Sequence, residues 1–243
     1  MSSDERRPLL EHLEELRQRL WTCLVSLLVA ATVVWLKREE AMAWLLAPVG
    51  QVTFTTLTEP FVAELKLAFF GGLILSFPVL LWQIWEFVCV ALTGRERQAV
   101  GRLLPLSILL FVGGAWLALT QLIPVSVRFF LGFASPNMVP MISVGKYLGF
   151  VGSMTLACGF LAQTPLVIAA LARLGIVTPG FLIYHWKGAV LISFVVAAIA
   201  TPTPDIFTQS LLASFLLGLY LLSMVLAWFA QPRHRESEVA VLS

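Results

Sequence analysis

Six apolar runs, nearly free of charged side chains, divide this chain, and most of them are as long as a membrane-spanning helix. A helix needs about 20 apolar residues to cross the hydrocarbon core of a bilayer. We therefore expect an all-α polytopic membrane protein with six transmembrane helices in one domain, residues 1–232, and a disordered tail, residues 233–243. The spans are expected roughly at residues 20–36, 67–92, 103–124, 148–172, 188–200 and 206–229.

The composition fits a bilayer environment and excludes several classes of function. The chain is 59% hydrophobic and 12% charged, whereas soluble domains are typically about 25% charged. The net charge of +2, without a basic aromatic patch, argues against nucleic-acid binding. The three cysteines lie inside apolar runs without CxxC spacing and the three histidines lie outside them, so we expect no metal site and no cofactor.

The distribution of Lys and Arg predicts the topology. Eleven of the 16 basic residues fall in the N-terminal tail, the second and fourth connecting segments and the C-terminal tail, and five fall on the alternate side. Because cytoplasmic segments carry an excess of Lys and Arg, both termini are predicted to be cytoplasmic.

The last two spans should form a short hairpin. The run before Thr201 has about 13 residues and reaches only about 20 Å as a helix. Pro202 and Pro204 then prevent a continuous helix, and Asp205 is placed to cap the next one. Such a hairpin should thin the bilayer locally or leave its tip submerged. Prolines inside other spans should kink their helices into a curved wall, namely Pro78, Pro105, Pro124 and Pro165.

The N-terminal segment, residues 8–20, has leucines at helical spacing, and Glu15 and Arg19 stand four residues apart. Two interpretations remain open. The segment is an interfacial helix that leads into the first span, or it also presents an acidic face to a ligand.

Three further polar residues allow both structural and functional interpretations. Glu86 lies near the end of the second span, where an acid normally has a partner or a function. Glu96 lies in the next loop, between Arg95 and Arg97. Gln163 is the strongly polar residue in the middle of the fourth span, where it could hydrogen-bond within the protein or dock a partner helix. Glu59 is expected to begin a helix.

These segments resemble the TatC component of the twin-arginine protein translocase. The resemblance covers nearly the whole chain and follows the order "HLEELRQRL", "EPFVAELKLAFF", "SFPVLLWQIWEF", "GRERQ", "FLAQTPLV" and "TPTPDIFTQSLLA". It implies a curved, glove-like arrangement of six helices with short fifth and sixth helices, and a cytoplasmic-membrane receptor rather than an enzyme.

The resemblance also implies partners and a mechanism. Family members recognise signal peptides that carry paired arginines. With TatA- and TatB-type single-span proteins they export folded proteins, driven by the proton-motive force. A homo-oligomeric translocase, membrane lipid and twin-arginine cargo are thus the expected partners.

Individual positions follow from the same resemblance. Those implied in signal binding are Glu96, Phe87, Glu15, Leu16, Arg17 and Arg19; Pro48 matches a proline of the first external loop. Gln163 stands where the family often has glutamate, so a buried titrating acid is missing there, while docking of a partner helix remains open. Glu86 is not implied by the resemblance; with Asp205 it is an auxiliary candidate from the residues alone, and Pro48 is likewise auxiliary.

A physical argument links the acids to paired arginines. Guanidinium is always charged, and its planar fork of donors matches a carboxylate. Three rival functions remain: a small-molecule transporter using Glu86 and Gln163, an intramembrane hydrolase, and a passive scaffold. Apolar centres in most spans disfavour the first. The absence of a G-x-S-G pattern or of histidine in the spans disfavours the second.

Overall fold

The structure is a computed structural model, and it describes residues 6–90, 104–135, 139–173, 175–201 and 205–230. Within these ranges, five helices are long and apolar enough to cross a membrane, and a sixth apolar helix is shorter. The elements are α1 (Arg6–Leu36), α2 (Arg38–Leu46), α3 (Glu59–Val90), α5 (Leu104–Leu117), the π-helix η1 (Ala118–Leu122), α6 (Ile123–Leu131), α7 (Val144–Leu161), α8 (Thr164–Arg173), α9 (Pro179–Tyr184), α10 (Trp186–Ala200) and α11 (Ile206–Ala230).

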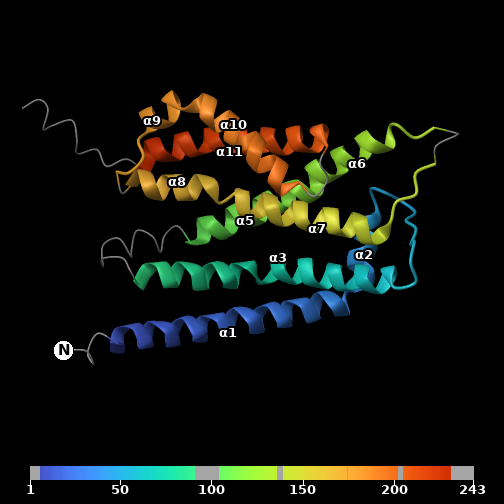
Figure 1. Ribbon diagram of the computed structural model, residues 1–243, viewed down its shortest axis with the longest axis horizontal. Coiled ribbons are helices and arrows are strands. Elements are labelled where there is room, and N and C mark those ends of the chain that lie inside the picture. The colour runs from blue at the N-terminus through green and yellow to red at the C-terminus, as the bar shows by residue number, and fades with distance from the viewer. Residues whose placement is uncertain (1–5, 91–103, 136–138, 174, 202–204, 231–243) are drawn as a thin grey trace, which may run out of the picture.

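The long helices run back and forth between two ends of the molecule (Figure 1). The N-terminal face contains the start of α1, the end of α3, the start of α5, the end of α8 and α9. The opposite face contains α2, the starts of α3 and α7 and the end of α6. Helices α1 and α3 lie side by side along one edge, and α10 and α11 lie along the other.

Several helices extend beyond the apolar runs that predict them. Helix α1 is continuous over 31 residues, so the segment 8–20 and the first span form one helix instead of two. Helix α3 begins at Glu59, before residue 67, where the apolar run begins. The charged residues Glu64 and Lys66 limit the apolar run but do not interrupt the helix. Hydropathy locates the part of a helix inside the hydrocarbon, whereas hydrogen bonding and capping decide where the helix ends.

The prolines act differently from one helix to the next. Pro165 follows a break at Ala162 and Gln163 that separates α7 from α8. Pro124 follows η1, where a π turn accommodates a helix that cannot form its regular hydrogen bond at the proline. Pro78 remains inside the continuous helix α3. Whether a proline kinks its helix therefore depends on how the neighbouring turns accommodate the carbonyl that the missing N–H leaves unpaired.

The hairpin of α10 and α11 is only partly short. Helix α10 has 15 residues, whereas α11 has 25 and is long enough to cross the hydrocarbon core, so the shortness expected of both helices holds for the first alone. The Asp205 carboxylate accepts a hydrogen bond from the Thr208 N–H at 2.6 Å, which makes Asp205 the predicted N-cap. In Figure 1 this hairpin stops short of the far ends of α3 and α7.

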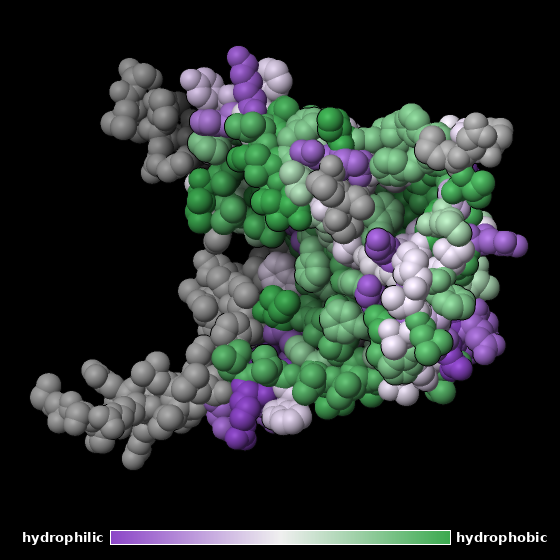
Figure 2. Space-filling view, turned by 45° about the vertical axis from the view of Figure 1, so that its right-hand side comes forward, coloured by the Kyte–Doolittle hydropathy of each residue, from purple (hydrophilic) through white to green (hydrophobic). Residues whose placement is uncertain are grey.

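Large apolar side chains cover much of the outer surface. The space-filling view shows broad hydrophobic areas with hydrophilic residues in separate patches (Figure 2). Leu28, Val29, Leu109 and Leu191 are each about 60% exposed or more. Because such a surface is unfavourable in water, the bilayer must cover it, and the chain is a multi-pass membrane protein.

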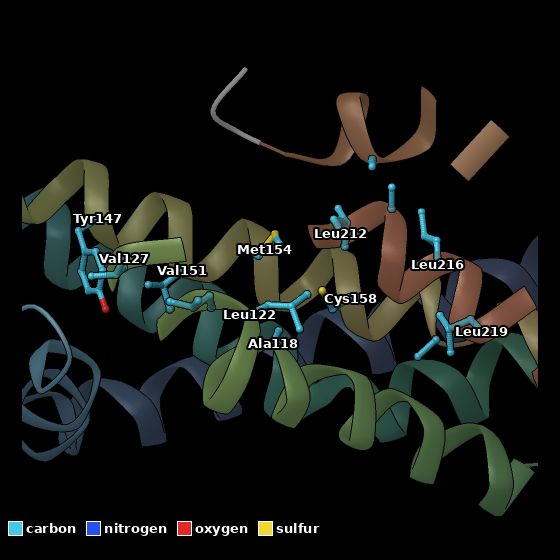
Figure 3. Close-up of a cluster of buried hydrophobic side chains, with 14 residues drawn as sticks. Ala118, Leu122, Val127, Tyr147, Val151, Met154, Cys158, Leu212, Leu216 and Leu219 are labelled. Carbon is cyan, nitrogen blue, oxygen red and sulfur yellow. The ribbon is translucent and has the colours of Figure 1, made fainter. Parts of the chain in front are cut away.

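The main core lies where η1, α6, α7 and α11 meet (Figure 3). Met154 and Cys158 of α7 face Leu122 of η1 and Leu212 of α11 in this cluster. Small residues bring other helices close together. A Cβ on Gly72 of α3 would come within 2.8 Å of Ala31 of α1, so glycine is required for this approach.

Candidate functional site

An ion pair joins α1 to α3 near the N-terminal face. The guanidinium of Arg19 lies 3.2 Å from the carboxylate of Glu86. The Arg19 side chain is 15% exposed and that of Glu86 is 45% exposed. A carboxylate near the end of an apolar helix requires a partner, and Arg19 supplies it from the neighbouring helix. The structural interpretation of Glu86 is therefore sufficient to explain its position.

The other predicted residues of this face are only partly described. Leu16 is 41% exposed, and the exposed Arg17 donates a hydrogen bond to Glu14 of the same helix. The backbones of Glu15 and Phe87 are helical, but their side chains are not among those that the structure describes. Glu96 also lies outside them, so its role as a signal-binding residue remains a prediction. The structure thus brings Arg19 and Glu86 together at the N-terminal face, where Leu16 and Arg17 of α1 also lie.

Gln163 lies at the break between α7 and α8, where it holds α5. Its amide oxygen accepts a hydrogen bond from Ser107 Oγ at 2.7 Å, and its amide nitrogen donates to the Ser107 carbonyl at 2.9 Å. The Trp85 indole of α3 also donates to Ser107 Oγ, at 3.4 Å. These contacts tie three helices together and give Gln163 a structural role. Docking of a partner helix at this position remains a prediction.

The opposite face contains a carboxylate network that sequence analysis missed. Glu59 begins α3 as predicted, but its side chain does more than occupy the first turn. One carboxylate oxygen accepts hydrogen bonds from Ser143 Oγ and from the Gly145 N–H at 3.1 Å. The other accepts from the Thr55 N–H at 2.6 Å and from Thr55 Oγ1 at 2.8 Å. A single acid therefore connects the first loop, α3 and the start of α7.

Further contacts strengthen the same face. Thr53 pairs with the segment before α7, since its N–H donates to the Ile142 carbonyl at 2.9 Å. Lys66 donates to the Gly145 carbonyl at 3.0 Å. Arg38 of α2 lies 3.3 Å from Glu64 of α3. Pro48, which the resemblance placed in the first external loop, is an exposed turn residue after α2 at this face.

A sequence signal for the Glu59 network existed, although it was weak. The acid stands four residues after Thr55, in a segment rich in threonine, and Ser143 opens the helix that Glu59 contacts. Local capping patterns can locate such residues, but contacts across 84 positions cannot be read from one sequence.

A family model and two similar relatives, all of TatC proteins, match most of the chain. Residues 11–214 match the model of the family Sec-independent protein translocase protein (TatC). The chain is 35% identical over 239 residues to the Sec-independent protein translocase protein TatC of Carboxydothermus hydrogenoformans, covering 97% of this chain and 98% of that protein. It is 34% identical to the TatC protein of Aquifex aeolicus, covering 96% and 100% of the two chains.

Solved structures give the same result in three dimensions. A crystal structure of the twin arginine translocase receptor TatC superimposes with a TM-score of 0.76 at 33% identity, covering 90% of this chain and 99% of that one. A second, determined in the detergent DDM, gives a TM-score of 0.78 at 32% identity. Sequence similarity over nearly the full length of both chains, together with the shared arrangement of apolar helices, shows that this chain belongs to the TatC family of Sec-independent protein translocase proteins.

Proposed function

We propose that this chain is the receptor subunit of a twin-arginine translocase in the cytoplasmic membrane. It binds twin-arginine signal peptides at its N-terminal face, which faces the cytoplasm together with both termini. TatA- and TatB-type single-span partners join it in a homo-oligomeric translocase, and the proton-motive force drives export of folded proteins. Family membership and the excess of Lys and Arg in the segments of this face support the proposal.

The observation that carries the proposal is the match to the TatC family over residues 11–214, together with the likeness to a solved twin arginine translocase receptor. Helix α3 ends at Val90 and α5 begins at Leu104, so residues 91–103, including Glu96, connect two helix ends at this same face. The Arg19–Glu86 ion pair already places an arginine on an acid at this face. Glu96, ten residues further along the chain, is the acid that we propose for the arginines of the signal.

The chemistry accounts for a preference for arginine over lysine. A charge-assisted hydrogen bond contributes about 1.5–3 kcal/mol where it is partly desolvated. Two arginines with one such contact each would gain about 3–6 kcal/mol before ordering costs. Lysine carries the charge but lacks the planar fork, so it loses the paired geometry. Arg95 and Arg97 would hold Glu96 until the signal displaces them.

The apolar part of a signal peptide requires its own contact surface. An open groove of about 650 Å³ between α1 and α3 begins at Gln18, next to Arg19. Its walls include Trp21, Val25 and Val29, which are each more than 50% exposed. An apolar segment that follows the paired arginines could lie in this groove while the arginines contact the acids. Burial there would supply the affinity that the polar contacts lack.

Replacement of Glu96 by Ala tests the proposal. We expect Glu96→Ala to abolish export of a twin-arginine substrate while the protein still inserts and accumulates. Glu64→Ala is the matched control, because Glu64 is an acid of the opposite face and pairs with Arg38. Normal export by Glu96→Ala, or equal loss in both variants, would remove Glu96 from the binding site.

A further inference from the structure

The connection between α9 and α10 exposes an unusual group of side chains at the N-terminal face. We define the elbow as residues 181–187, the end of α9 and the start of α10. Tyr184 is 82% exposed, Ile183 63%, Trp186 55% and Phe181 54%. Four large apolar or aromatic residues within six positions are too many for a surface that faces water alone.

The elbow is held firmly although its side chains point outward. Leu182 is buried between α8 and α11, in a cluster with Ala172 and Ala227. Its carbonyl accepts a hydrogen bond from the Tyr220 hydroxyl at 2.6 Å. The His185 ring lies 2.9 Å from the Phe181 carbonyl and so closes the end of α9. The exposed residues are therefore presented by a fixed support.

Positive charge accompanies the aromatic residues. Lys187 is exposed, with its ammonium 6.0 Å from the Trp186 ring. Arg173, at the end of α8, is exposed next to Ala172 of the same cluster. No Asp or Glu occurs in the sequence between Glu96 and Asp205, so α8, α9 and α10 carry no acid of their own beside these charges.

We propose that the elbow binds the headgroups of anionic phospholipids. Trp and Tyr favour the interface between headgroups and hydrocarbon, and Lys and Arg next to them attract anionic lipid. The elbow combines both at the end of the molecule where α3 and α8 also end (Figure 1). This inference is independent of signal recognition.

Such an anchor would also determine the depth of the short hairpin. Helix α10 has 15 residues and spans about 22 Å, less than the roughly 30 Å of the hydrocarbon core. When the elbow is held at the headgroups of one leaflet, the whole shortfall lies at the hairpin tip. The other leaflet must then thin, or the tip must remain submerged.

Photocrosslinking of the full chain in nanodiscs of mixed neutral and anionic phospholipid tests the inference. A benzophenone amino acid replaces Tyr184, and in a matched control it replaces Met141, which is 81% exposed at the opposite face. We expect the anionic share of lipid adducts to be about fivefold higher at position 184 than at position 141. Lys187→Gln combined with Arg173→Gln should remove this enrichment, whereas Lys146→Gln should not.

Three results would overturn the inference. Equal anionic shares at positions 184 and 141 would show that the elbow has no preference for charge. If the enrichment persists in the Lys187→Gln, Arg173→Gln variant, it does not depend on the two basic residues. In native membranes, adducts with another protein in place of lipid would make the elbow a protein-docking surface.

Discussion

The two ends of the helices are held together in different ways. At the opposite face, Glu59 of α3 accepts hydrogen bonds from two other segments, the loop before α3 and the start of α7, and Thr53, Lys66 and Arg38 add further links. At the N-terminal face, the described link between α1 and α3 is a partly exposed ion pair of Arg19 with Glu86. We call the opposite face the fixed end; at the N-terminal face, the ion pair between α1 and α3 remains partly accessible to solvent.

The largest effect on stability is expected at the fixed end. Glu59→Gln replaces one acceptor oxygen with an amide donor, which then faces Thr55 or Ser143 donors and cannot accept their hydrogen bonds. We expect the melting temperature in detergent to fall by several degrees and the cellular amount to decrease. The discrimination between paired arginine and paired lysine in the remaining protein should not change.

Glu39→Gln is the control for this variant, because Glu39 is an exposed acid in the first turn of α2. An unchanged melting temperature for Glu59→Gln would mean that the fixed end does not depend on this carboxylate. The comparison between the two faces would then fail.

A smaller loss is expected at the break between α7 and α8. Gln163→Ala removes two hydrogen bonds to Ser107, and intramembrane hydrogen bonds average about 0.6 kcal/mol each, so unfolding free energy should fall by about 1 kcal/mol. Gln163→Glu should keep the contact with Ser107 Oγ and lose the bond to the Ser107 carbonyl. Loss of export by Gln163→Ala at unchanged stability would favour partner docking over a structural role.

The sequence alone was sufficient for the spans, because the bilayer imposes length and apolarity on each of them. It also placed Asp205 as a cap, since a local pattern specifies that role. It could not show that Glu86 pairs with Arg19, or that Gln163 meets Ser107, because those contacts join residues 67 and 56 positions apart. The residues of α1 were expected to be helical as two segments, 8–20 and 20–36, and the structure joins them in one helix, since charged turns continue a helix beyond the hydrocarbon.

The ion pair between Arg19 and Glu86 at the N-terminal face should contribute little to stability. A double-mutant cycle with Arg19→Gln and Glu86→Gln should give about 0.2–1 kcal/mol, because Glu86 is nearly half exposed and water screens the pair. The coupling should decrease as salt is added. A coupling well above this range would make the N-terminal face as rigid as the opposite one.

The smallest effect is expected for a surface pair. Lys37 donates a hydrogen bond to Glu40 at 2.7 Å between two exposed side chains at the opposite face. Lys37→Gln should leave the melting temperature unchanged within error, because such pairs contribute little in water. A clear loss of stability would mean that charge at this face acts beyond the network centred on Glu59.

The most direct test of signal recognition places a photocrosslinker in the signal peptide, beside its arginine pair, so that position 96 of the receptor carries no crosslinker. Adducts with residues 91–103 are then compared for Arg-Arg and Lys-Lys signals, in the wild type and in Glu96→Gln. We predict strong labelling with Arg-Arg, weak labelling with Lys-Lys, and loss of that difference in the variant. Equal labelling by both signals in the wild type would contradict selection of guanidinium by Glu96.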